Sequence, residues 1–94
     1  MSDWFTVKET GEGLQTAMMT LKPGAASGPM SNEHPQSEQV LYVVSGLVTA
    51  EIGDRKWVMQ PGDSTIVPRS VPHRFRNEGS EPAITFNVYG PPAY

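Results

Sequence analysis

Hydrophobic residues in this chain occur in short stretches that glycine, proline and polar residues separate, and several stretches alternate apolar with polar positions. This pattern is typical of β-strands, whose successive side chains point to opposite faces of a sheet. It predicts eight strands, at residues 4–10, 14–22, 39–45, 47–52, 55–60, 64–68, 73–77 and 83–89. No window has the period of an amphipathic helix with start and stop signals, so we expect an all-β sandwich or barrel.

Two short turns and one long loop connect the predicted strands. Gly53-Asp54 separates two strand-like runs by two residues, which fits a β-hairpin with glycine at the first central position. Residues 60–63 predict a second turn. Residues 22–38 form the one long loop, which holds one of the chain's two histidines. Loops longer than about 12 residues in a compact domain are usually functional or disordered, so we look for a site here.

The length of 94 residues allows one domain. We divide it into N-terminal strands (1–22), the loop (23–38), further strands (39–89) and a proline-rich tail (90–94). Nine glycines and nine prolines disfavour a helical bundle, because both residues destabilise helix interiors. We expect the tail either to pack against the domain or simply to end the chain after its last strand.

Charge and composition exclude several function classes. Seven basic against ten acidic residues give a net charge of −3, so no nucleic-acid partner is expected. No apolar run reaches the ~18 residues of a membrane span, and the first residues lack the basic and apolar regions of a signal peptide. We therefore expect a cytoplasmic protein with no membrane partner. The absence of cysteine excludes disulfides, zinc–thiolate sites and a thiol nucleophile.

The most specific pattern lies between residues 62 and 77. It reads Gly62, five residues, Pro68, one residue, Ser70, two residues, His73, three residues, Asn77. This resembles the second signature motif of the cupin superfamily, which has glycine at the place that Ser70 holds. Four of the five fixed positions match at the right spacing.

The first cupin motif usually reads Gly, five residues, His-X-His, three or four residues, Glu, six residues, Gly. Anchored at Gly46, the motif places Gln39 in the glutamate position, His34 as the second histidine and Asn32 as the first. An alternative register takes His34 as the first histidine and Gln36 as the second. The first register is preferred because it keeps both the six-residue and the four-residue spacing.

The resemblance, which covers the chain from about residue 23 onward, implies a double-stranded β-helix, a jelly-roll barrel of two antiparallel sheets. It also implies a divalent metal (Zn, Fe, Mn, Ni or Cu) bound by His34, His73, Gln39 and Asn32. The complete family motif offers three histidines and a glutamate. An amide oxygen is neutral and a poorer donor than a carboxylate, so we expect weak metal binding.

The period of two also assigns side chains to the inside of the barrel. His73 and Phe75 share a face, and Phe75 makes that face the inner one. Tyr42 and Phe75 are candidates to line a substrate pocket, with an ordinary place in the core as the alternative. Glu33 and Glu38 are expected to point away from the pocket if the preferred register holds.

These features predict a small cupin that binds a divalent metal and a small anionic or enolisable molecule, with dioxygenase or isomerase chemistry as candidate reactions. The alternative is a non-catalytic, metal-free module that binds or senses a small ligand, and a third class is a purely structural partner protein. Whether the protein is an enzyme stays open. A homodimer is expected, because a core of this size is small and the N-terminal strand can pair with a neighbouring sheet edge.

Overall fold

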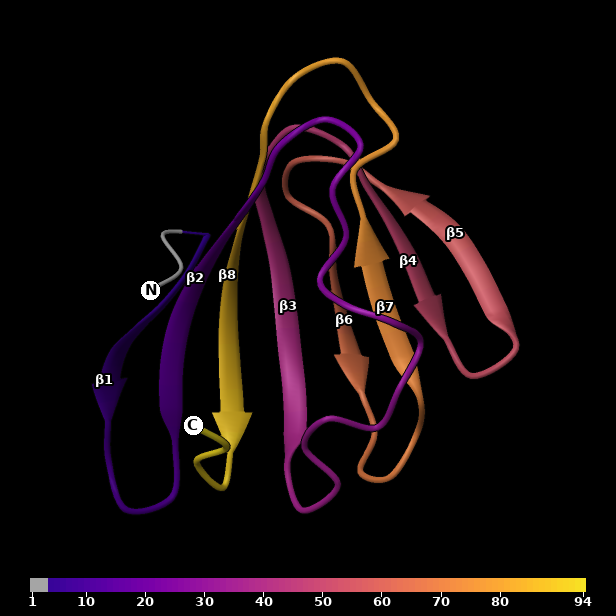
Figure 1. Ribbon diagram of the computed structural model, residues 1–94. Coiled ribbons are helices and arrows are strands. Elements are labelled where there is room, and N and C mark those ends of the chain that lie inside the picture. Colours follow the sequence, from indigo (N-terminus) through magenta and orange to yellow (C-terminus); the bar gives the residue numbers. More distant parts are fainter. Residues whose placement is uncertain (1–3) are drawn as a thin grey trace.

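The computed structural model describes residues 4–94 and contains, in that range, eight β-strands and no helix (Figure 1). The strands are β1 (Phe5–Thr10), β2 (Gln15–Leu21), β3 (Glu38–Ser45), β4 (Val48–Ile52), β5 (Arg55–Met59), β6 (Ser64–Val67), β7 (His73–Arg76) and β8 (Ala83–Gly90). All eight predicted strands are present, with ends that differ by one residue in most cases. Across the described residues, no helix is long and apolar enough to cross a membrane.

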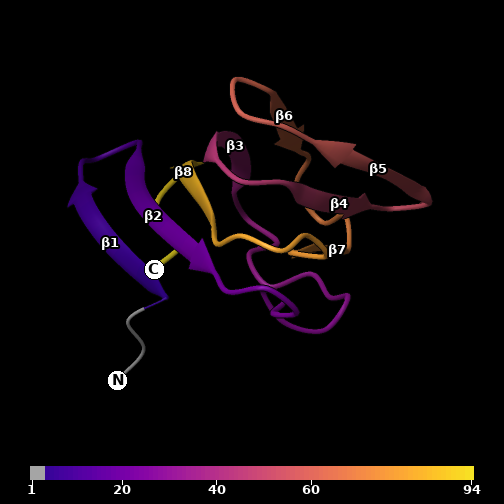
Figure 2. The ribbon, with the colours of Figure 1, turned by 90° about the horizontal axis from the view of Figure 1, so that it is seen from above.

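The strands form two antiparallel sheets. The larger sheet has the order β1-β2-β8-β3-β6, and the smaller one has the order β5-β4-β7. Figure 2 shows the molecule from above, with β1 and β2 at one side and β4, β5 and β7 at the other. The predicted jelly roll of two antiparallel sheets is confirmed. The predicted hairpin is also present, since β4 and β5 pair around Gly53 and Asp54.

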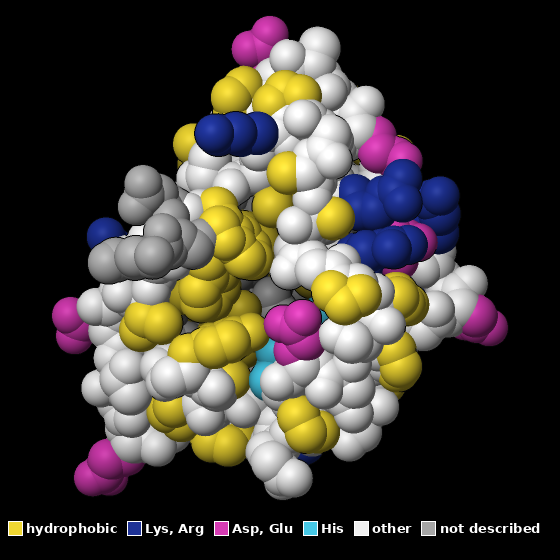
Figure 3. Space-filling model, in the orientation of Figure 1, with side chains coloured by type: hydrophobic (Ala, Val, Ile, Leu, Met, Phe, Trp, Pro, Cys, Tyr) yellow, Lys and Arg dark blue, Asp and Glu magenta, His cyan; other side chains and the backbone are white. Residues whose placement is uncertain are grey.

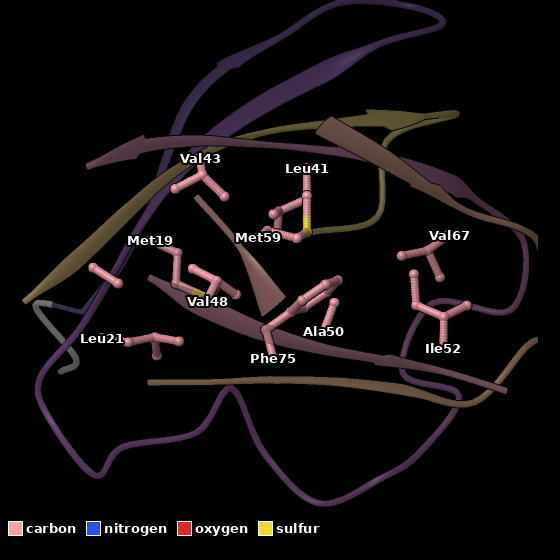
Figure 4. Close-up of a cluster of buried hydrophobic side chains, with 11 residues drawn as sticks. Met19, Leu21, Leu41, Val43, Val48, Ala50, Ile52, Met59, Val67 and Phe75 are labelled. Atoms are coloured by element: carbon pink, nitrogen blue, oxygen red, sulfur yellow. The ribbon is translucent and has the colours of Figure 1, made fainter. Parts of the chain in front are cut away.

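The hydrophobic core lies between the two sheets and follows the alternation of each strand. In β2 the side chains of Ala17, Met19 and Leu21 are buried, and in β3 those of Leu41 and Val43 are buried. Figure 4 shows side chains of both sheets meeting in one cluster. The cluster contains Met19, Leu21, Leu41, Val43, Val48, Ala50, Ile52, Met59, Val67, Phe75 and Ala83.

The loop between β2 and β3 runs beside β7 and extends the smaller sheet (Figure 1). Ala26 bridges to Arg76, and Ser31 bridges to His73, where backbone hydrogen bonds of 3.0 and 3.3 Å join the two residues. This pairing anchors the loop next to the start of β7. It therefore brings a histidine of the loop close to the histidine that begins β7.

A glycine permits the close approach of the β3–β4 connection to the start of β8. Gly46 has a φ of +80°, and a Cβ atom there would overlap the carbonyl oxygen of Pro82 and lie 2.7 Å from the Cα atom of Ala83. Both neighbours are backbone atoms, which cannot rotate away as a side chain can. Gly46 is also the residue that ends the first motif, so its place in the motif has a steric reason.

Candidate functional site

A cavity of about 240 Å³ opens between the sheets. In Figure 3 a hollow exposes part of a histidine, with an acidic side chain on one rim and hydrophobic side chains on the other. The cavity is lined by Trp4, Phe5, Met19, Ser27, Pro29, Glu33, His34, Gln39, His73, Phe75, Tyr89 and Tyr94. Both histidines of the chain thus contribute to one cavity.

His73 is held in one orientation by the backbone beside it. Its Nδ1 atom donates a hydrogen bond of 3.0 Å to the carbonyl oxygen of Val71, so Nε2 of the neutral ring carries the lone pair. Burial lowers the pKa of His73, and the nearby His34 lowers it further, against opposing contributions from Val71 and Glu33. The ring is therefore neutral near pH 7, which is the form that binds metals or accepts a proton.

His34 extends from the loop toward His73. The two ring centres are 4.6 Å apart, with an angle of 47° between the ring planes. Nδ1 of His34 donates to the carbonyl oxygen of Ser37 at 3.2 Å, and Nε2 lies 2.9 Å from Oε1 of Gln39. Like His73, His34 thus uses Nδ1 for a backbone carbonyl and leaves Nε2 for the cavity.

Gln39 is held by a buried polar network on β8. Its Nε2 atom donates to Oδ1 of Asn87 at 3.2 Å, and Nδ2 of Asn87 donates to Oγ1 of Thr85 at 3.1 Å. All three side chains are buried. Sequence reasoning missed Asn87 and Thr85, although their alternation with Ala83 and Tyr89 places all four on the inner face of β8.

The contact between His34 and Gln39 joins two acceptors. Because the carbonyl oxygen of Ser37 can only accept, Nδ1 of His34 carries a proton, and in a ring with this single proton Nε2 has a lone pair that faces Oε1 of Gln39. Two acceptors at this separation repel unless a proton or a metal ion lies between them. The repulsion also disappears if the side-chain amides of Gln39 and Asn87 both reverse, since each group then has a partner.

Three of the four predicted metal ligands come together, and the fourth does not. His34, His73 and Gln39 line the cavity, whereas Asn32 is exposed and lies outside the lining. Residues 32–36 form bends and turns instead of a strand, so the rule that places Asn32 and His34 on one face does not hold here. The described residues 4–94 contain no group of three or more His, Cys, Asp or Glu that could hold a metal ion.

Two further predictions about the pocket are wrong. Tyr42 does not line the cavity but is 43% exposed on the outer face of β3. Gln39 and Tyr42 are three residues apart on one strand, so alternation puts them on opposite faces. Glu33 lines the cavity, although it was expected to point away. Glu38 is exposed as predicted, and Phe75 is buried in the core and lines the cavity.

Two tyrosines and the chain's tail complete one wall of the cavity. Tyr89 is buried, and burial followed by the neighbouring Tyr94 raises the pKa of its phenol well above the ordinary value. The buried side chain of Gln15 holds the tail. Its Oε1 atom accepts from the backbone N–H groups of Ala93 and Tyr94 at 3.0 and 2.8 Å, and its Nε2 atom donates to the carbonyl oxygen of Tyr94 at 2.6 Å. Gln15 therefore fixes Tyr94 at the cavity.

The donor chemistry of the cavity fits a divalent ion. Two imidazoles that bind one ion side by side, with bonds of about 2.0 to 2.1 Å, have ring centres about 4.5 to 5 Å apart. The separation of 4.6 Å between His34 and His73 agrees with this. Gln39 supplies an amide oxygen next to His34.

Fold and site together define a small jelly-roll barrel with a two-histidine cavity between its sheets. The family model of the cupin domain matches residues 17–89, so the chain belongs to the cupin family. Polyketide synthase CurC of Streptomyces cyaneus is 28% identical over 88 residues, which cover 81% of this chain and 57% of the relative. The chain thus spans little more than half of that protein.

Solved structures share the fold along nearly the whole chain. The structure of BH2720 from Bacillus halodurans has a TM-score of 0.88 at 25% identity, covering 97% of this chain and 72% of that one. The structure of TT1209 from Thermus thermophilus has a TM-score of 0.82 at 28% identity, covering 93% of this chain and 81% of that one.

Proposed function

We propose that the cavity binds a divalent metal ion through Nε2 of His34, Nε2 of His73 and Oε1 of Gln39, and that a small enolisable molecule binds beside it. The observation that carries the proposal is the 2.9 Å contact of Nε2 of His34 with Oε1 of Gln39, which joins two acceptors when the ring carries its single proton on Nδ1. A cation between them turns a repulsion into two favourable contacts. The hydrogen bonds from Nδ1 of both histidines to backbone carbonyls support it, because such bonds orient metal-binding histidines.

The residues of the cavity suit a metal-assisted reaction of a carbonyl compound. A bound divalent ion would act as a Lewis acid toward a carbonyl oxygen, and neutral ligands would leave its charge undiminished. Phe5, Met19 and Phe75 give the cavity an apolar side. The similarity to a protein named polyketide synthase agrees with an enolisable substrate, since polyketide chains carry carbonyl groups on alternate carbons, with an acidic CH₂ between them. Dioxygenase and isomerase chemistry remain the candidate reactions.

The ligand is better described as enolisable than as anionic. Of the described residues, no lysine or arginine lines the cavity, and Glu33 is the only lining residue of fixed charge among them. Attraction of an anion would therefore depend on the metal alone. Arg74 and Arg76 have acidic partners elsewhere, Glu51 and Glu78.

Metal analysis of tag-free protein tests the proposal directly. We expect about one divalent ion per chain after dialysis against a metal mixture, and loss of that ion in His34→Ala and His73→Ala. An Asn32→Ala variant is the matched control, because Asn32 is exposed outside the cavity, and it should keep the ion. A wild-type protein that binds no divalent ion, or a His34→Ala variant that still binds one, would overturn the proposal.

A metal-free ligand-binding module is the second candidate. It is favoured by the network of His34, Gln39, Asn87 and Thr85, in which reversal of both amides gives every group a partner without an ion. Ligand binding that survives complete metal removal, with no change in affinity, would select this candidate.

We also propose that the protein forms a homodimer through the outer face of its larger sheet. Five apolar side chains on this face, 36% to 57% exposed, form what we call the apolar patch: Val40, Tyr42, Val44, Ile66 and Phe86. They are neighbours in register, since Val40 pairs with Ile66 and Tyr42 pairs with Phe86. A second copy fits this patch because a two-fold interface uses the same surface on both chains, and the patch contains no charges that would repel each other. The patch is a better candidate than the N-terminal strand, whose Trp4 and Phe5 line the cavity.

A further inference from the structure

Glu33 brings a carboxylate to the cavity without a cation to neutralise it. Among the described residues no lysine or arginine forms an ion pair with it, whereas Glu38, Glu51 and Glu78 each have an arginine partner. Its hydrogen-bond partner is the hydroxyl of Ser31, which donates to Oε1 at 3.4 Å. Within residues 4–94, the cavity therefore has a negative charge at its rim that no lysine or arginine pairs with.

The loop is shaped to leave room for this carboxylate. Gly28 has a φ of +149°, and a Cβ atom at this position would lie 2.9 Å from Oε1 of Glu33. A side chain at position 28 would meet this carboxylate oxygen, and the positive φ disfavours residues other than glycine. With this glycine, Glu33 lies in the cavity lining together with Tyr89 and Tyr94.

Aromatic rings form the opposite side of the same cavity. The ring centre of Phe5 lies 5.8 Å from that of Trp4, 4.9 Å from that of Tyr94 and 6.5 Å from that of Tyr89. Tyr89 and Tyr94 are 5.1 Å apart and nearly perpendicular. Aromatic faces carry partial negative charge and attract organic cations, and a nearby carboxylate strengthens that attraction.

We infer that the mouth of the cavity, formed by Glu33 and the aromatic wall of Trp4, Phe5, Tyr89 and Tyr94, recognises an organic ammonium group. This inference rests on the proposed role of the cavity as a small-molecule site, and it names the substrate class as a compound with a positively charged amine. It does not require the metal, because the mouth residues differ from the three metal ligands.

Binding of three matched probes to metal-free protein tests the inference. Choline is the cation, 3,3-dimethylbutan-1-ol is its neutral counterpart of the same shape, and 3,3-dimethylbutanoate is an anion of similar size. Titration followed by NMR shifts of the Trp4 indole should give an affinity for choline about five- to tenfold higher than for the alcohol. The anion should bind more weakly than the alcohol. Equal affinity for all three probes, or no binding of choline, would overturn the inference.

Variants of two glutamates test whether the preference for choline over the alcohol arises at the mouth of the cavity. Glu33→Gln keeps the shape of the side chain and should reduce the preference for choline over the alcohol to about twofold or less. Glu38→Gln is the matched control, since Glu38 is exposed and pairs with Arg69 at 3.8 Å, and it should leave the preference unchanged. A preference that survives in Glu33→Gln would contradict the inference.

Metal analysis together with the titration of metal-free protein separates the two proposals, since a bound divalent ion would itself repel an ammonium group. Protein that binds no metal but prefers choline would refute only the metal site, and protein that binds metal but shows no preference would refute only the ammonium site.

Discussion

Asn87 accepts a hydrogen bond from the side-chain amide of Gln39 at 3.2 Å, and this contact turns the Gln39 carbonyl oxygen toward His34. Asn87 lies on β8 and Gln39 on β3, which are adjacent strands of the larger sheet. The direction of one buried amide thus decides whether the cavity presents an acceptor or a donor to His34. An acceptor suits a metal ion, and a donor suits a closed hydrogen-bond network.

Gln39→Glu should tighten metal binding, by about tenfold or more, because a carboxylate adds the charge that the amide lacks. Calorimetric titration of metal into the wild-type and variant proteins measures the difference. Gln36→Glu adds the same charge to an exposed position of the loop and should have little effect. The same control also tests the alternative register of the first motif, in which Gln36 is a metal ligand. In that register, Gln36→Glu would bind the metal more tightly than Gln39→Glu does.

Asn87→Leu should destabilise the fold by about 1 to 3 kcal/mol, because the amide of Gln39 and the hydroxyl of Thr85 lose their buried partner. Urea unfolding followed by circular dichroism gives the change in the free energy of unfolding. Asn32→Leu is a suitable control, since Asn32 is exposed and should change stability by less than about 0.5 kcal/mol. Equal unfolding curves for wild type and Asn87→Leu would show that the network adds nothing to stability.

Gly46→Ala should lower the free energy of unfolding by about 2 to 4 kcal/mol, because the new Cβ atom meets backbone atoms of Pro82 and Ala83 and the positive φ is strained for alanine. Gly13→Ala is the control, since a Cβ atom at Gly13 has no neighbour within 4 Å. Thermal unfolding of both variants checks this prediction, and a small loss in Gly46→Ala would mean that the backbone around residue 82 shifts easily.

Stability at low pH should depend on Glu51. Arg74 donates two hydrogen bonds to its carboxylate, at 2.8 and 3.1 Å, and the hydrogen bond from Arg74 is the main cause that lowers the pKa of Glu51 below its ordinary value of 4.5. The unfolded chain therefore takes up this proton at a higher pH than the folded protein does. The contribution of the Glu51–Arg74 pair to the stability of the fold is therefore present above pH 4.5, and it is lost as the pH falls through the lowered pKa of Glu51.

The urea midpoint of Glu51→Gln should consequently fall less than that of the wild type between about pH 6 and pH 3. Glu12→Gln, at an exposed bend, should follow the wild type. Parallel pH profiles for the wild type and Glu51→Gln would rule out this contribution.

Val40→Glu should dissociate the homodimer, because it places a charge in the middle of the apolar patch. Light scattering at micromolar concentration should give twice the chain mass of 10.3 kDa for wild type and the chain mass for the variant. Val7→Glu changes an exposed residue of β1, the edge strand, and should stay dimeric. If Val7→Glu dissociates the dimer and Val40→Glu does not, the interface lies at the N-terminal strand instead. A wild-type protein that is monomeric would refute the dimer.

The fold could be predicted from the sequence because each strand carries its own alternation. Gln39, Leu41 and Val43 point inward along β3 by the same rule that puts Tyr42 outside, so the error at Tyr42 was avoidable. Asn32 and Glu33 are different, since they lie in a segment of bends and turns to which no periodicity applies. Its path depends on pairing with β7, and such a long-range contact leaves no local signal.

The two ends of the described chain meet at the same opening, since Trp4 and Tyr94 both line the cavity. The described chain therefore begins and ends beside the opening of the cavity. A polyhistidine tag at either end would bring additional imidazoles within reach of His34 and His73 and could supply ligands that the chain itself lacks. A natural fusion partner at either end would gain the same access, and would be placed to control what enters.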